Sequence, residues 1–152
     1  MTAGAERRGQ PHGPKESRHR GRESAIQMLY QWEVGKISMF EVRQTFWGGP
    51  ASEDAIPEPD RAFATALADG VAEQVAELDP IIAEAAEHWR IERMNVMDRL
   101  ILRLAVYEFL KEPATPAKVI INEALELAKT FSGEESVKFI NGILDAAKKK
   151  MP

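Results

Sequence analysis

The chain has 152 residues, of which 44% are hydrophobic, and it carries a formal net charge of −4 with no cysteine. This size and apolar content suit one domain with a buried core, and the lack of cysteine excludes disulfides, thiol chemistry and thiolate metal sites. No apolar run approaches the ~18 residues of a membrane span, and no apolar segment follows the basic N-terminus as in a signal peptide.

The charge is unevenly distributed. Residues 1–22 contain six basic residues against two glutamates, a net +4, so the other 130 residues carry −8. The basic residues are Arg7, Arg8, Lys15, Arg18, Arg20 and Arg22. A basic segment on an acidic body indicates an anion-binding element, and nucleic acid is the commonest such anion. A solvated tail that only aids solubility is the alternative, and charge alone does not choose between them.

The N-terminal residues and the first helices differ sharply in composition. Residues 1–17 are rich in glycine and proline and are expected to be a disordered extension, whereas residues 18–152 are expected to form one helical domain. A first helix is predicted from Glu23 to near Gly35. A capping box at Ser38 and Glu41 starts a short second helix to about Phe46, and a loop is predicted over 47–59.

The middle of the chain is predicted to hold two long helices. Asp60 is the expected cap of the first, whose apolar stripe is Phe63, Leu67, Val71, Val75 and Leu78. Gly70 within this helix is expected to mark a close helix crossing. Asp79-Pro80 is expected to end it and start the next helix in a new direction, with Ile81, Ile82, Ala85 and Trp89 as its apolar residues.

The C-terminal half is predicted to contain the central helix. Asn95 caps an apolar segment over 96–111, and the proline-containing stretch 112–116 breaks it. A further helix begins at Thr115-Pro116, and a capping box at Ser132 and Glu135 starts the last helix. Its expected core residues are Phe139, Ile140, Ile143 and Leu144. Because no segment shows strand-like alternation, the sequence predicts an all-α fold of about seven helices.

No arrangement of residues predicts catalysis. His88 and Glu84 are spaced to share a helix face, but two ligands fall short of a zinc site. Ser132 has carboxylates nearby but no base, and there is no glycine-rich phosphate loop. We therefore expect no enzyme activity, no catalytic residue, no metal and no cofactor.

Three classes of binding protein remain. A helix-turn-helix DNA reader needs a basic recognition helix, and no interior helix is basic. Single-stranded RNA suits the mixed surface better, because a few cations hold phosphates while polar and aromatic side chains meet the bases. A pure protein-interaction bundle stays open.

Three blocks of sequence carry a more specific signal. They are RHRGRESAIQMLYQWEVG at 18–35, DRLILRLAVYEFL at 98–110 and INEALELAKTFSGEESVKFINGILD at 121–145. In their order and spacing they resemble the NusB family of bacterial transcription antitermination factors. The resemblance covers roughly residues 18–147, and its most specific part is the third block.

The resemblance implies two helical bundles packed together and a cytoplasmic, non-membrane protein. It implies binding to boxA RNA in nascent ribosomal RNA operon transcripts together with NusE, a small-subunit ribosomal protein. It also implies association with RNA polymerase and other Nus factors, and it leaves both a monomer and a homodimer open. The alternatives are a protein-interaction module or an RNA-binding accessory domain related to that of rRNA cytosine methyltransferases.

The resemblance also implies site residues. RNA contacts are expected at Arg18, Arg20, Arg22, Lys118, Asn122, Glu135, Lys138 and Phe139, and NusE contacts at Glu92 and Asp98. Simpler readings exist for several of them: Phe139 as core, Lys118 as plain surface, Asn122 as a buried amide, Glu135 as a cap and Asp98 as a helix-dipole partner. Gly21 stands where alanine would be usual, so we expect the basic segment to be loosely ordered.

Overall fold

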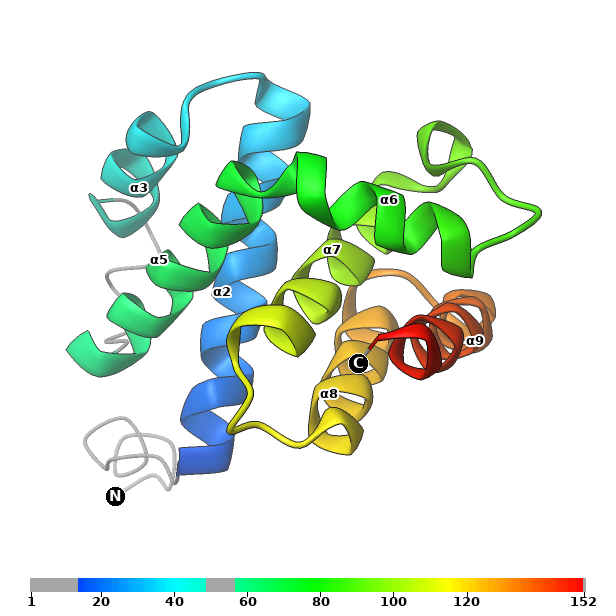
Figure 1. Ribbon diagram of the computed structural model, residues 1–152. Helices are drawn as coiled ribbons and strands as arrows, with labels where there is room; N and C mark the ends of the chain where they lie inside the picture. The colour runs from blue at the N-terminus through cyan, green and yellow to red at the C-terminus, as the bar shows by residue number, and fades with distance from the viewer. Residues whose placement is uncertain (1–13, 49–56, 152) are drawn as a thin grey trace. The chain divides into compact units, whose positions relative to one another are not determined.

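The computed structural model describes residues 14–48 and 57–151 (Figure 1). Within those ranges the chain forms seven α-helices and one short 3₁₀-helix and no strand, which confirms the predicted all-α class. None of the described helices is long and apolar enough to cross a membrane. The chain divides into two compact units, residues 1–67 and 68–152, and each is described by itself.

The first unit is built from α2 (Pro14–Gly35), α3 (Met39–Gly48) and the first part of α5 (Glu58–Glu73). Its buried apolar residues are Ala25, Ile26, Met28, Leu29, Val42, Phe46, Ala64 and Leu67. The predicted cap of α3 is confirmed, because the Glu41 N–H donates to Ser38 Oγ at 3.2 Å. Helix α2 begins at Pro14, earlier than predicted, and proline suits a first helical position. Residues 14–17 are therefore helical where disorder was predicted, and the rest of the predicted extension, 1–13, lies outside the described residues.

The second unit contains α6 (Val75–Ala85), the 3₁₀-helix η1 (Ile91–Arg93), α7 (Val96–Lys111), α8 (Ala117–Phe131) and α9 (Glu134–Lys150). Helix α7 packs against α6, α8 and α9, as Figure 1 shows. It is the most buried of these helices, with every residue from Leu100 to Val106 in the core. The predicted central helix is confirmed, and so is its cap, because Asn95 Oδ1 accepts from the Met97 N–H at 2.8 Å.

Three further predicted helix boundaries are wrong. Helix α5 begins at Glu58, and Asp60 lies buried in its first turn instead of capping it. Of the loop predicted over 47–59, residues 47–48 and 58–59 are helical, and 49–56 lie outside the described residues. The break predicted at Asp79-Pro80 lies at Gln74, and α6 continues through Pro80. Ser132 closes α8 as its C-cap and Gly133 precedes α9, so Ser132 and Glu135 form no capping box.

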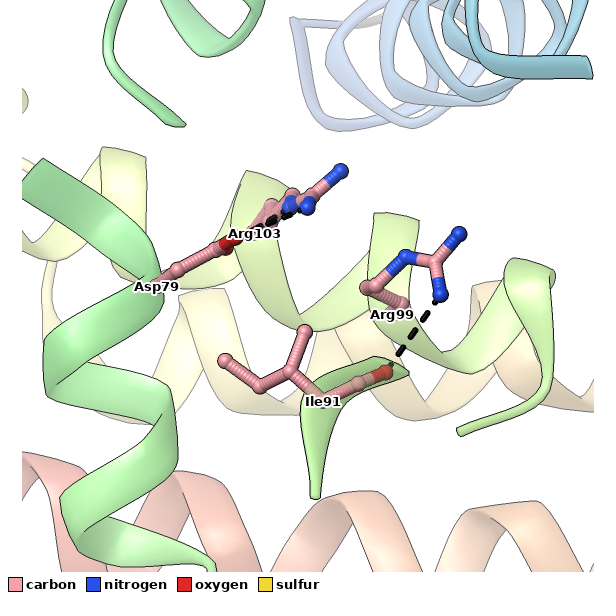
Figure 2. A network of polar contacts seen from close by, with 4 residues as sticks. All are labelled: Asp79, Ile91, Arg99 and Arg103. Carbon is pink, nitrogen blue, oxygen red and sulfur yellow. Dashed lines mark hydrogen bonds and ion pairs between the residues drawn. The ribbon is translucent and has the colours of Figure 1, made fainter. Parts of the chain in front are cut away.

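Asp79 has a different role from the predicted one. Its two carboxylate oxygens accept from Nε and Nη2 of Arg103, each at 2.8 Å, which joins α6 to α7 (Figure 2). Arg99, one turn earlier on α7, donates to the Ile91 carbonyl at 3.3 Å and so holds η1. A planar guanidinium group favours the two-pronged contact of Arg103, and the two arginines together hold α6 and η1 against α7.

Gly70 marks a close helix crossing, as predicted. A Cβ atom at this position would collide with the hydroxyl end of Tyr107 on α7. Burial raises the pKa of that hydroxyl above its ordinary value of 10.0, and the Glu112 and Glu73 carboxylates raise the pKa further. The missing side chain at Gly70 therefore lets a tyrosine pack neutral against α5.

Candidate nucleic-acid interface

The basic segment at the N-terminal end of α2 is packed against α5 within the first unit. The Arg18 guanidinium lies 4.1 Å from the centre of the Phe63 ring, and that of Arg22 lies 5.6 Å from it. Arginines over an aromatic face are held by the ring's negative quadrupole. The two arginines are one helical turn apart, so a single ring orders both.

Gly21 explains how this packing is reached. It is buried, and a Cβ there would lie 2.5 Å from Cδ2 of Phe63, far inside van der Waals contact. The absence of a side chain at Gly21 therefore permits the close approach of the Phe63 ring. The basic segment is part of an ordered helix, although we had expected it to be loosely ordered. Arg18 is exposed and Arg20 half-buried, but Arg22 is only 4% exposed. Burial disfavours direct phosphate contact by Arg22 and leaves Arg18 and Arg20 as the accessible pair.

A cavity of about 390 Å³ opens on the second unit. The segment after α6 contributes Trp89 and Arg93, the start of α7 contributes Asn95 and Asp98, and α9 contributes Glu135, Ser136 and Phe139. The Trp89 and Phe139 rings meet edge to face, with centroids 5.3 Å apart and an interplanar angle of 83°. Sequence periodicity had placed Trp89 on an apolar stripe, but α6 ends at Ala85 and the Trp89 side chain is 59% exposed.

Asp98 lines this cavity and belongs to a small polar network. Its carboxylate is only 7% exposed and accepts hydrogen bonds from Ser132 Oγ at 2.9 Å and from Ser136 Oγ at 3.0 Å. These bonds tie the start of α7 to the C-cap of α8 and to the first turn of α9. Asp98 therefore positions the end of α9 that bears Glu135 and Phe139, and little of it is accessible to a partner protein.

The other expected site residues divide into two groups. Glu135 is exposed and Phe139 half-buried at the cavity, so Phe139 is not a fully buried core residue. Lys118 and Asn122 are exposed on α8 and do not line the cavity, which rules out the buried-amide reading of Asn122. Exposed Lys138 and Glu92 do not line it either.

Five residues that line this cavity were not expected from the sequence: Trp89, Arg93, Met94, Ser136, and Asn95 beyond its capping role. The turn between α6 and Trp89 includes Glu87 with a positive φ of 26°. Positive φ is uncommon for glutamate, so the sequence does not predict this turn. Across residues 14–48 and 57–151 no group of acidic or histidine side chains is arranged to hold a metal ion.

The comparisons agree on one family. The NusB family model matches residues 19–149. The transcription antitermination protein NusB of Solibacter usitatus (strain Ellin6076) is 47% identical over 136 residues, covering 90% of this chain and 91% of that protein. The structure of T. maritima NusB is 32% identical with a TM-score of 0.76, covering 88% of this chain and 91% of that one.

The same fold occurs in a chain from the crystal structure of the antitermination factors NusB and NusE in complex with double-stranded RNA. That chain is 24% identical, with a TM-score of 0.78 and coverage of 90% of this chain and 98% of its own length. At this identity the likeness concerns the fold. The family model and the Solibacter relative each span most of the sequence, so the protein belongs to the NusB family.

Proposed function

We propose that this protein is a transcription antitermination factor that binds boxA RNA jointly with NusE and acts on the transcribing RNA polymerase. The observation that carries the proposal is the NusB family match along residues 19–149, supported by relatives that are named transcription antitermination proteins. Such a factor works where transcription takes place, so we place it in the cytoplasm. It binds and positions its partners and performs no chemistry of its own.

Two accessible areas are suited to RNA. Arg18 and Arg20 supply cations on α2, and α9 offers Lys138 beside Phe139 and Glu135 at the cavity. Lys118 and Asn122 add an exposed cation and an exposed amide on α8. Cations hold phosphates without regard to sequence, whereas aromatic and amide groups meet bases.

The number of accessible cations sets the expected affinity. About two to four phosphate contacts on single-stranded RNA give a slope of log K against log salt of about −1.4 to −2.8. RNA binding by this chain alone is then modest and sensitive to salt. NusE adds the remaining contacts, and exposed Glu92 is the better placed of the two expected NusE contacts, because Asp98 is buried.

The test is fluorescence anisotropy of a boxA-type RNA and of a scrambled RNA of equal length, each at two salt concentrations. We expect tighter binding of the boxA-type RNA and a salt slope in the range above. Arg18→Gln should lower the magnitude of the slope by about 0.7, the share of one phosphate, while exposed Lys149→Gln in the last turn of α9 serves as a matched charge control. Equal, weak binding of both RNAs would reject the proposal in favour of a protein-interaction module.

A further inference from the structure

The turn after α6 presents a large aromatic side chain beside a cavity. We propose that Trp89, Phe139 and Arg93 form a pocket for one unstacked nucleotide of single-stranded RNA, with Trp89 stacking on its base and Arg93 contacting its phosphate. This assignment rests on the proposed function and adds Trp89, Arg93 and Asn95 to the RNA-binding residues.

The exposure of Trp89 is the first support. A tryptophan that is 59% exposed keeps much apolar surface in water, although the same chain buries smaller apolar residues completely. Its ring stands edge-on to Phe139 at 5.3 Å, so the Phe139 ring supports it from one side. A planar base is the complement of an exposed aromatic ring, because every base has a π-face and stacking tolerates any sequence.

The cavity beside this pair supplies the second support. Its volume of about 390 Å³ is within the range of small-ligand sites. Asn95 uses Oδ1 to cap α7, which fixes its amide and leaves the NH₂ group as a donor. Glu135 at the cavity provides a carboxylate acceptor. A donor and an acceptor beside a stacking ring are the groups that read a base edge in RNA recognition.

Charge favours a nucleotide over a peptide as the occupant. Arg93 lines the cavity, is exposed, and forms no ion pair with any residue in the described ranges. Exposed Arg90 lies three residues before it, and exposed Lys138 precedes Phe139. Two acidic side chains line the cavity. Asp98 is buried and bonded to two serine hydroxyls, and exposed Glu135 is the carboxylate assigned to the base edge. An anion with a flat apolar part matches this set.

The test uses the full chain with a boxA-type RNA and with a series of RNAs that each lack one base. Trp89→Ala should weaken binding of the intact RNA by about 5- to 150-fold, the range of one base–aromatic stack, and Trp89→Phe should restore most of it. At one position, removing the base should weaken the wild type but leave Trp89→Ala unchanged, because the same contact is already lost. Phe40→Ala is the control, since Phe40 is also 59% exposed but belongs to the first unit.

A second variant tests the phosphate contact separately. Arg93→Gln should lower the magnitude of the salt slope by about 0.7. If the wild type prefers boxA-type RNA but Trp89→Ala binds as tightly as Phe40→Ala and no abasic position depends on Trp89, the pocket is refuted while the proposed function stands. If the wild type itself shows no preference, the proposed function fails. If Trp89→Ala does not fold, as circular dichroism would show, the abasic series with Trp89→Phe and the slope of Arg93→Gln decide.

Discussion

Asp98 allows the sharpest test of the reasoning, because the structure gives it a positioning role where a partner contact had been expected. Replacing it with alanine removes the acceptor of two hydrogen bonds, from Ser132 at 2.9 Å and Ser136 at 3.0 Å. Hydrogen bonds to a charged group contribute about 1.5–3 kcal/mol each. Because Ser132 is exposed and Ser136 half-buried, hydrogen bonds to water replace part of this lost free energy in the variant. We expect Asp98→Ala to lower the free energy of unfolding by about 2–3 kcal/mol.

The assay is urea unfolding followed by far-ultraviolet circular dichroism, with Tm as a second measure. For a chain of this length the loss corresponds to a fall in Tm of about 4–12 °C. Exposed Glu92→Ala is the control and should change stability by less than about 0.5 kcal/mol. The double variant with Ser136→Ala should lose less than the sum of the two single losses. Additive losses, or an Asp98→Ala protein as stable as the Glu92→Ala protein, would refute the positioning role.

Three further predictions concern the second unit. Gly70→Ala should destabilise the protein by about 1–3 kcal/mol in urea unfolding, because a Cβ there overlaps Tyr107. Gly142→Ala, on the same assay, should stabilise it by up to about 1 kcal/mol, because Gly142 is exposed within α9 with open space around it; equal effects of the two changes would contradict the crossing. Asp79→Ala should cost about 2 kcal/mol by removing the two-pronged partner of buried Arg103, and Asp79→Glu should recover only part of this, since the pairing geometry changes. Because the pKa of Tyr107 is raised in the folded state, its contribution to stability is full below pH 10, the unfolded value, and is lost as pH rises toward the higher folded pKa. Tyr107→Phe should flatten that fall in unfolding free energy above about pH 10, and identical alkaline profiles for the two proteins would contradict it.

Helical periodicity accounts for most of what sequence could predict. The mostly apolar run from Leu100 to Val106 identified α7 as the central helix, and the absence of a side chain at Gly70 pointed to a crossing. The caps at Ser38 and Asn95 were readable because their partners lie two or three residues away. Capping interactions of this kind can be predicted because both partners lie close together in the sequence.

Two of the wrong boundaries, at Asp79 and Ser132, have a common physical cause. Asp79 resembles a helix cap, yet its carboxylate binds Arg103, which is 24 residues away in the chain. Ser132 resembles another cap, yet its hydroxyl donates to Asp98, 34 residues away. Capping residues serve whichever partner the tertiary structure supplies, and a single sequence does not reveal that partner.

The candidate site was predictable only in part. The family resemblance pointed to Glu135 and Phe139, and both lie at the cavity. It gave no sign of Trp89, because the pattern of apolar residues cannot distinguish a core tryptophan from one carried outward by a turn. Nor could the sequence show that Phe63 packs under Arg18 and Arg22 from a helix about forty residues further on.

The central claim is joint recognition of boxA RNA by this chain and NusE. The most direct measurement is the ratio of Kd for scrambled RNA to Kd for boxA-type RNA, obtained by fluorescence anisotropy with and without NusE at one fixed salt concentration. We expect a ratio above one for the chain alone and a larger ratio, with tighter boxA binding, when NusE is present. A ratio of one that NusE leaves unchanged would contradict it.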